Sequence, residues 1–230
     1  MKKSILLPIC LFIILPTFCQ SYMDPAQAYR MLKIQNDGYT YMQVGTYKVI
    51  GTPYLFGGKK AGSIYAKNEF GNSALVSYNI FSQQLEFTLD GKTTLVKEQA
   101  DVDSFILRAD GEYFFEDLFF VNASVIGSGE KCFFHLMSEG TKFNLYKKYS
   151  SKLEIVSTNY LQSELRQFSL SADFYYVDKA NRFVKKLKLN KKAISTEFKY
   201  VRDLTNTLMN MDLGVETDKK LKSVFTILNQ

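Results

Sequence analysis

The stretch Gln84-Leu-Glu-Phe-Thr-Leu-Asp-Gly91 indicates the fold more clearly than any other part of the chain. Apolar Leu85, Phe87 and Leu89 alternate with polar residues, which is the period of a strand with one buried and one solvated face. The Asp-Gly dipeptide that follows is a strong hairpin signal, and residues 93–97 supply a returning strand. We therefore expect an antiparallel sheet with one face in water.

Short runs rich in Tyr, Phe, Val, Ile and Thr extend this pattern in both directions along the chain. Turn residues such as Asp110-Gly111 separate the runs. The strands that we expect, besides residues 84–89 and 93–97, are 63–67, 74–80, 102–108, 113–121, 131–137, 142–149, 153–157, 173–177 and 183–189.

Helical patterns lie at the two ends of this β-rich region. Asp24-Pro25 is a typical helix start and predicts a short N-terminal helix through Ile34. Near the C-terminus, apolar residues at three- and four-residue steps predict a helix over residues 191–211, capped by Asn190, and a second helix capped by Thr217. We expect an α+β fold that is mostly β: an antiparallel β-meander, forming a curved sheet or an open barrel or sandwich, with two C-terminal helices packed on it.

The first nineteen residues have the pattern of a secretory signal peptide. Lys2 and Lys3 precede an apolar stretch over residues 5–15 that is too short for a stable membrane span. Small residues before Gln20 suit cleavage at that position. An alternative is lipidation of Cys19, although bulky Phe18 is unlike the small residues that usually precede a lipidated cysteine. We therefore expect an exported protein of the periplasm or outer-membrane periphery, or a secreted one.

The net charge of +6 is unevenly distributed along the 230 residues. Without Lys2 and Lys3, residues 20–178 carry −3 and residues 179–230 carry +7. We expect an antiparallel β domain over 20–178 and a basic region over 179–230, formed by a strand or link and the helical pair. The lysines concentrated in this region are Lys185, Lys186, Lys188, Lys191 and Lys192. A basic region of this kind is suited to anionic lipid head groups or other polyanions, and export makes nucleic acid an improbable partner.

The small number of cysteine and histidine residues excludes several chemistries. Processing leaves Cys132 as the one cysteine, so no internal disulfide forms, and His135 is the one histidine. Any triad, Cys-His dyad or multi-histidine zinc site would need His135. On a strand, residues three apart point to opposite faces and lie about 10 Å apart, so Cys132 and His135 do not form a dyad without a bulge. We interpret both as buried structural residues.

Two glycine-containing segments and several carboxylates are the remaining candidates. Residues 127–131 lack the full spacing of a phosphate-binding loop and predict a β-turn, and residues 57–60 predict an exposed loop with anion contact as an alternative. A hydrolase would need a pair of carboxylates. The pairs are Asp101 with Asp103 and Glu116 with Asp117, and Glu130 is a further candidate; Glu116 and Asp117 also predict a bend between strands.

Several short segments form a recognisable set: Gly51-Thr-Pro-Tyr-Leu55, Gly62-Ser-Ile-Tyr65, Tyr78-Asn-Ile80, Leu85-Glu-Phe87, Asp173-Phe-Tyr-Tyr-Val177 and Phe183-Val-Lys-Lys-Leu-Lys-Leu-Asn-Lys-Lys-Ala193. This set resembles a widespread group of uncharacterised exported proteins of Bacteroidota-type bacteria. The resemblance covers residues 45–90 and 140–229, and it contains no catalytic signature. It implies an exported β-rich domain with a helical end and no assigned activity.

These patterns together predict a non-catalytic binding or scaffold module of the cell envelope, with an unknown envelope protein or ligand as its partner. The first alternative is a peripheral binder of membranes or envelope polyanions through the basic C-terminal region. The second is a hydrolase that uses a carboxylate pair. We predict no catalytic residue, cofactor site or metal site. The oligomeric state and the closure of the sheet around a cavity remain open at this point.

Overall fold

The computed structural model describes residues 41–44, 47–67, 69–89, 92–96, 102–157, 164–209 and 211–230. The predicted signal peptide, the predicted N-terminal helix, the Asp90-Gly91 turn and Asp101 lie outside these residues. Strands make up 46% of the chain and helices 18%, and the sheet is not closed. The predicted mostly-β class with C-terminal helices is therefore confirmed.

The strands form one sheet in the order β1-β2-β11-β10-β9-β8-β7-β3-β4-β5-β6, with β12 paired to β11 beside this path. Their bounds are β1 Tyr41–Val44, β2 Tyr47–Ile50, β3 Lys60–Ala66, β4 Glu69–Asn79, β5 Gln84–Leu89, β6 Lys92–Val96, β7 Ser104–Leu107, β8 Leu118–Asn122, β9 Phe133–Ser138, β10 Phe143–Ser157, β11 Glu164–Asp178 and β12 Phe183–Leu187. A 3₁₀ turn spans Leu55–Gly57, and the helices are α2 Lys191–Phe198, α3 Thr205–Met209 and α4 Thr217–Leu228.

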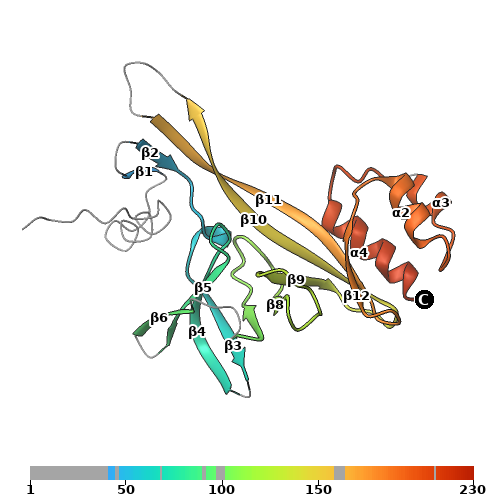
Figure 1. Cartoon of the computed structure of the whole chain (residues 1–230), viewed down its shortest axis with the longest axis horizontal. Coiled ribbons are helices and arrows are strands. Elements are labelled where there is room, and N and C mark those ends of the chain that lie inside the picture. The colour runs from blue at the N-terminus through green and yellow to red at the C-terminus, as the bar shows by residue number, and fades with distance from the viewer. Residues whose placement is uncertain are drawn as a thin grey trace, which may run out of the picture.

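The sheet is mixed rather than wholly antiparallel. Strand β2 runs parallel to β11, and the other paired strands that the structure describes are antiparallel. Strands β5 and β6 pair around the predicted hairpin, with Leu89 opposite Lys92. In Figure 1, β10 and β11 form a long twisted hairpin that runs from the helical end of the molecule toward β1 and β2.

Several strand boundaries differ from the sequence prediction: β11 begins at Glu164 rather than at 173, β4 begins at Glu69 rather than at 74, and two further differences have local causes. The strands expected at 142–149 and 153–157 form the single strand β10, because pairing with β11 continues through the polar residues between them. There the hydroxyl oxygens of Ser150 and Ser171 lie 2.8 Å apart across the strands.

The strand expected at 113–121 begins only at Leu118. Asp110 Oδ1 accepts hydrogen bonds from the N–H groups of residues 112–114 and holds that segment in a loop. The predicted bend at Glu116 and Asp117 is thus confirmed.

The single helix expected over residues 191–211 is wrong, because the chain forms two helices there. Helix α2 ends at Phe198, and α3 begins at Thr205, whose N–H donates to Asp203 Oδ1 at 2.9 Å. A side-chain acceptor of this kind offers the backbone a new helix start in place of a continuous helix. Helix α4 is present as expected, but it begins at Thr217 itself, because Glu216 rather than the predicted Thr217 takes the N-cap position.

The interior is divided into two main cores. The sheet core lies among the first strands of the chain together with β7, β8 and β9, and its centre is the stacked pair Phe105 and Phe120, with ring centroids 4.6 Å apart. The helix core lies between the three helices and the ends of β9 to β12, and it contains Phe198 and Phe225 with centroids 5.6 Å apart. Strands β9 and β10 contribute to both cores: Phe133 and Tyr149 belong to the sheet core, whereas Met137 and Leu145 belong to the helix core. The helical pair was expected to pack on the sheet, and the three helices do so.

Candidate functional site

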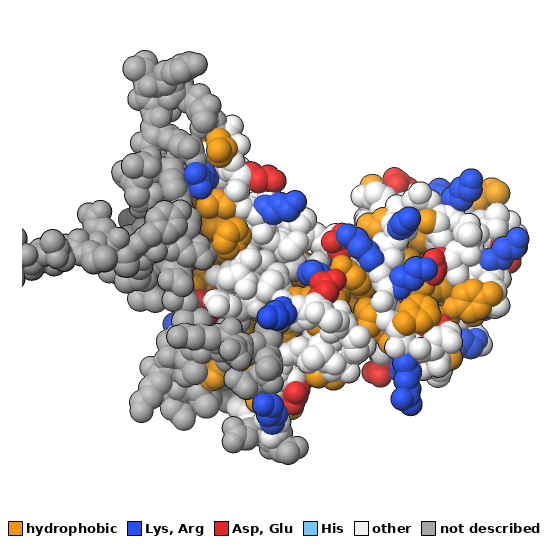
Figure 2. Space-filling view, in the orientation of Figure 1, with side chains coloured by type: hydrophobic (Ala, Val, Ile, Leu, Met, Phe, Trp, Pro, Cys, Tyr) orange, Lys and Arg blue, Asp and Glu red, His pale blue; other side chains and the backbone are white. Residues whose placement is uncertain are grey.

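A basic groove lies where β12 passes into α2. Asn190 ends the link between the two elements: its side chain accepts a hydrogen bond from the Ala193 N–H at 2.8 Å and caps α2. The groove has a volume of about 450 Å³. Its lining residues are Lys185, Lys186, Leu187, Lys188, Asn190, Lys192, Ala193, Thr196 and Glu197. Four lysines therefore surround one concave surface, and Figure 2 shows Lys and Arg side chains over this end of the molecule.

Two of these lysines are neutralised by neighbouring carboxylates. The Lys185 ammonium lies 2.5 Å from Glu197, and Lys186 lies 2.8 Å from Asp173 on β11. Burial opposes ionisation of Glu197, but hydrogen bonds from Lys185 and Tyr176 outweigh it and lower the pKa of this carboxyl. Glu197 is therefore ionised at neutral pH and holds the wall of the groove together.

The other two lysines of the groove form no ion pair with a described carboxylate, although the charge of Lys188 helps to lower the pKa of Glu197. Among the described residues, no acceptor or carboxylate contacts the ammonium groups of Lys188 and Lys192. Lys192 also lines a second depression of about 320 Å³, between α2 and α3, whose wall includes Leu208 and Met209. This arrangement favours binding of an anionic group, because two free ammonium groups share one concave surface.

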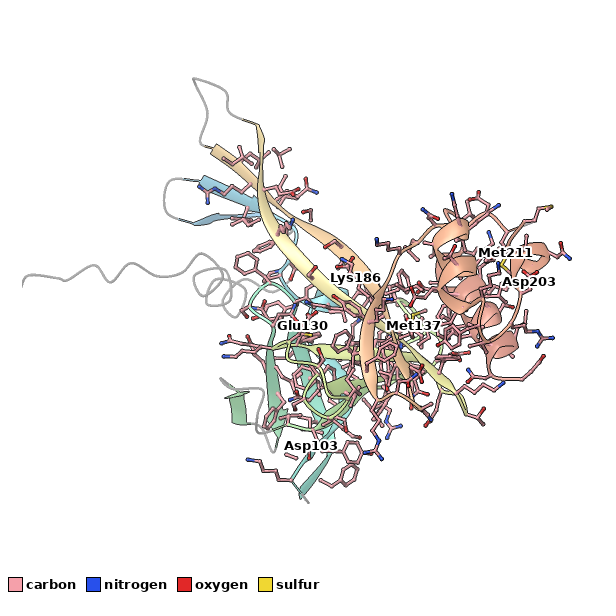
Figure 3. All side chains as sticks on the ribbon, turned by 45° about the vertical axis from the view of Figure 1, so that its right-hand side comes forward. Asp103, Glu130, Met137, Lys186, Asp203 and Met211 are labelled. Atoms are coloured by element: carbon pink, nitrogen blue, oxygen red, sulfur yellow. The ribbon has the colours of Figure 1, made fainter. Side chains whose placement is uncertain are left out.

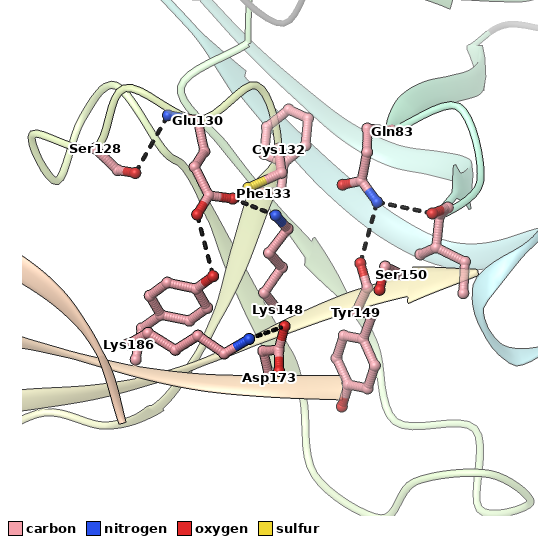
Figure 4. A network of polar contacts seen from close by, with 12 residues as sticks. Gln83, Ser128, Glu130, Cys132, Phe133, Lys148, Tyr149, Ser150, Asp173 and Lys186 are labelled. Carbon is pink, nitrogen blue, oxygen red and sulfur yellow. Dashed lines mark hydrogen bonds and ion pairs between the residues drawn. The ribbon is translucent and has the colours of Figure 1, made fainter. Parts of the chain in front are cut away.

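A polar network surrounds Glu130, beside β10 and β11 (Figure 4). The Glu130 carboxylate accepts hydrogen bonds from Lys148 and, at 3.1 Å, from the Tyr175 hydroxyl. Burial raises the pKa of Glu130, but the charge and hydrogen bond of Lys148 outweigh this effect and lower it. Residues 123–127 form the turn before Glu130, so the predicted turn lies slightly earlier than expected, and Glu130 ties it to the sheet.

Cys132 and His135 face different surroundings, as the strand geometry predicts. Cys132 is 1% exposed and packs with Phe134 and Tyr175 beneath the Glu130 network. Burial raises the pKa of its thiol to about 12, so the thiol is protonated and unreactive at neutral pH. His135 instead packs against the rings of Phe120 and Tyr149. The two residues do not form a dyad.

The candidate carboxylates are engaged in separate local contacts. Asp103 Oδ2 accepts the Lys67 N–H at 2.9 Å, beside the turn between β3 and β4. Asp117 lies 2.6 Å from Arg108 and also accepts the Ala109 N–H. Glu116 lies 3.7 Å from Lys222 on α4. Figure 3 shows Asp103 and Glu130 well apart, so the structure does not bring these described candidates into one cleft.

The predicted loop at residues 57–60 is likewise tied to its neighbours. Lys60 lies 2.7 Å from Asp110 and 4.2 Å from the ring centre of Tyr113. Hydrogen bonds from Lys60 and from three backbone N–H groups keep the pKa of Asp110 well below its usual range. The Lys60 charge is therefore compensated, and the anion contact considered for this loop receives no support from it.

Sequence reasoning found the lysines of the groove but not the groove itself. The spacing of Lys185, Lys188 and Lys192 shows a basic segment, whereas the concave surface arises from the angle between β12 and α2. The sequence also did not predict that His135 lies near Asp218 and Lys222 of α4. Nor did it predict that Asn229, directly after α4, accepts hydrogen bonds from the backbone of residues 142 and 143. No local signal in the sequence connects these residues with their partners.

Comparison with known proteins identifies no relative. No protein-family description, no curated protein and no solved structure matches this chain. Within the described part of the chain, no three His, Cys, Asp or Glu side chains are grouped so as to hold a metal ion. In the same residues, no helix has both the length and the apolar character needed to cross a bilayer. The resemblance to exported proteins of Bacteroidota-type bacteria remains a prediction, and the fold and the basic groove are the basis for a functional proposal.

Proposed function

We propose that the chain is an exported, non-catalytic binding module of the cell envelope that holds phosphate-bearing anionic groups in the basic groove between β12 and α2. The observation that carries the proposal is that the ammonium groups of Lys188 and Lys192 lie on one concave surface without a direct ion-pair partner among the described residues. The neighbouring Lys185 and Lys186 are already bound to carboxylates and act as the wall of the groove. A phosphate group would complete the charge balance at Lys188 and Lys192.

The location of the proposed ligand follows from the predicted signal peptide. Lys2, Lys3 and the apolar stretch that follows support export to the periplasm or the outer-membrane periphery. Anionic lipid head groups and phosphate-bearing polyanions are the ligands of this chemistry at an envelope surface. We propose the membrane surface as the main source of the anionic group, with soluble phosphate as the alternative source.

Binding of the whole chain to vesicles tests this proposal directly. The chain is sedimented with vesicles of phosphatidylcholine alone and with vesicles that also contain phosphatidylglycerol. A Lys near an anionic membrane contributes about 1 kcal/mol, so the double variant Lys188→Gln/Lys192→Gln should bind the anionic vesicles about 30-fold more weakly. Added salt should weaken binding of the unmodified chain.

The matched control removes the same charge elsewhere on the helices. Lys199 and Lys219 are exposed and do not line the groove, so Lys199→Gln/Lys219→Gln should retain most of the binding. An equal loss in both double variants would show that net charge alone drives binding, and it would overturn the groove as the site. Titration with inorganic phosphate separates a phosphate site from a membrane site. Absence of binding to both probes would contradict the proposal.

A further inference from the structure

His135 lies at the junction between the sheet and α4. It is on β9, directly opposite Phe120 of β8 and Lys147 of β10. The ring is 5.2 Å from the Phe120 ring and 6.2 Å from the Tyr149 ring, centre to centre. Only 8% of the residue is exposed, and its Nδ1 atom has no hydrogen-bond partner. The imidazole is thus held mainly by aromatic packing.

The charges around His135 come from three neighbouring elements. On β10, the Lys147 ammonium contacts both carboxylate oxygens of Asp218, the second residue of α4, at 2.7 and 2.9 Å. Lys222 lies one turn further along α4 and is 3.7 Å from Glu116 of the loop before β8. From β8 itself the ring faces the uncharged Phe120. The junction therefore already contains two cations and two carboxylates before His135 takes up a proton.

A proton on His135 would disturb this balance. The imidazolium would be a third cation beside Lys147 and Lys222, buried between two aromatic rings, and its Nδ1–H would have no acceptor. Burial, followed by the charges of Lys147 and Lys222, lowers the pKa of His135 to about 4, while Asp218 acts in the opposite direction. The closed junction thus strongly favours the neutral ring.

We propose that His135 is an acid-sensitive latch: its protonation releases the first turns of α4 from the sheet and opens the junction between the two cores. In the open form, water hydrates the imidazolium and the ring regains its ordinary proton affinity. The closed form is therefore fully favoured above pH 6.5, where both forms are neutral, and loses its advantage as the pH falls toward 4. Between pH 6.5 and pH 4 the ratio of open to closed forms should rise by about 80-fold.

The opening is expected to be local, because the far end of α4 is held to the sheet by the uncharged side chain of Asn229. The Asn229 side chain accepts hydrogen bonds from the Lys142 and Phe143 N–H groups at 2.8 and 2.9 Å. It also donates to the Phe143 carbonyl at 3.0 Å. None of these groups titrates between pH 4 and 7. The C-terminal end of α4 should therefore stay in place while its first turns, which include Leu221, separate from the sheet.

The single histidine makes the latch directly observable by NMR in the whole chain. The imidazole resonance should titrate with a midpoint near the folded-state pKa of about 4, and amide exchange in the first turns of α4 should accelerate as the pH falls below 6.5. Exchange is compared with unstructured peptides of the same sequence, which corrects for the direct effect of pH on exchange. In His135→Phe, which keeps an aromatic ring but cannot be protonated, the acceleration over this interval should be absent.

A second pair of variants tests the electrostatic part of the proposal. Lys222→Gln removes one of the cations that lower the pKa of His135, so the imidazole midpoint should move to higher pH and the acid-driven acceleration of exchange should become smaller, because the pKa values of the closed and open forms come closer together. Lys219→Gln removes an exposed lysine from the same helix and should leave both unchanged. The proposal is overturned if the imidazole titrates at its ordinary pKa near 6.5 in the folded chain. It is overturned equally if α4 opens identically with pH in His135→Phe.

Discussion

The two ends of α4 are attached to the same sheet by opposite kinds of contact. At its first turn, charged groups meet around a buried imidazole: Lys147 binds Asp218, and both lie near His135. At its last turn, the uncharged side chain of Asn229 exchanges hydrogen bonds with the backbone of residues 142 and 143. Contacts of the first kind depend on pH and salt, whereas contacts of the second kind depend on shape. We call the first turn of α4, with Asp218, its adjustable end, because its contacts depend on pH and salt. We call the last turn, followed by Asn229, its fixed end.

The largest expected effect concerns the adjustable end. The pKa of His135 is lowered in the folded protein, so the unfolded chain binds the proton more tightly, and acid destabilises the fold. The free energy of unfolding should fall by about 3 kcal/mol from pH 6.5 to pH 4 through this residue. Urea unfolding of the chain and of His135→Phe, at several pH values, measures the difference. Identical pH dependence in both proteins would refute this assignment.

The next effect concerns the fixed end. Asn229→Ala removes an acceptor shared by two backbone N–H groups and two donated hydrogen bonds, so the free energy of unfolding should fall by about 2 kcal/mol. This loss should be the same at pH 5 and pH 7, and in low and high salt. A loss that varies with pH would show that the two ends are not chemically distinct.

A smaller effect arises from the close fit around Asn229. A Cβ atom on Gly140 would lie 2.0 Å from Asn229 Cγ, so Gly140→Ala should displace the asparagine and cost about 1 kcal/mol. In the Asn229→Ala background the obstacle is gone, and the same change should cost little. A double-mutant cycle by urea unfolding should therefore give a coupling energy of about 1 kcal/mol. Additive costs would mean that Gly140 is needed for another reason.

The smallest effects are expected from the ion pairs at the adjustable end. Asp218→Asn leaves the mostly buried Lys147 without its partner and should cost about 1 kcal/mol at low salt and less at high salt. Glu116→Gln should change the free energy of unfolding by less than about 0.5 kcal/mol, because Glu116 is largely exposed and 3.7 Å from Lys222. Thermal unfolding at two salt concentrations ranks the two variants. The reverse order would show that Lys222, rather than Lys147, dominates the junction.

Local patterns in the sequence predicted the parts of the structure that local interactions determine. The alternation at Leu85, Phe87 and Leu89 predicted β5 and its hairpin partner, and strand geometry predicted the separation of Cys132 from His135. The parallel pairing of β2 with β11 was not predictable in this way, because it joins residues more than a hundred positions apart. The contacts of Asn229 span 86 and 87 residues and have no sequence signature.

In the candidate site, too, local sequence features were predictable and contacts between distant residues were not. The sequence identified Lys185, Lys186, Lys188 and Lys192 as a basic cluster, but it did not show which of them are already paired. Asp173 and Glu197, which neutralise two of the lysines, come from β11 and α2 and reach the groove only in the folded chain. Charge counts along a sequence therefore overstate the free charge, and packing decides which part of it remains available.

The strands shared by the two cores have a consequence for how the protein loses its structure. Strands β9 and β10 each contribute side chains to both cores: Phe133 of β9 and Tyr149 of β10 lie in the sheet core, and Met137 of β9 and Leu145 of β10 lie in the helix core. If β9 and β10 lose their order in one core, the other core therefore loses the side chains that these strands pack into it. Although the chain forms two cores, we expect them to melt together in one cooperative transition, and a core mutation at either end should lower the same melting temperature.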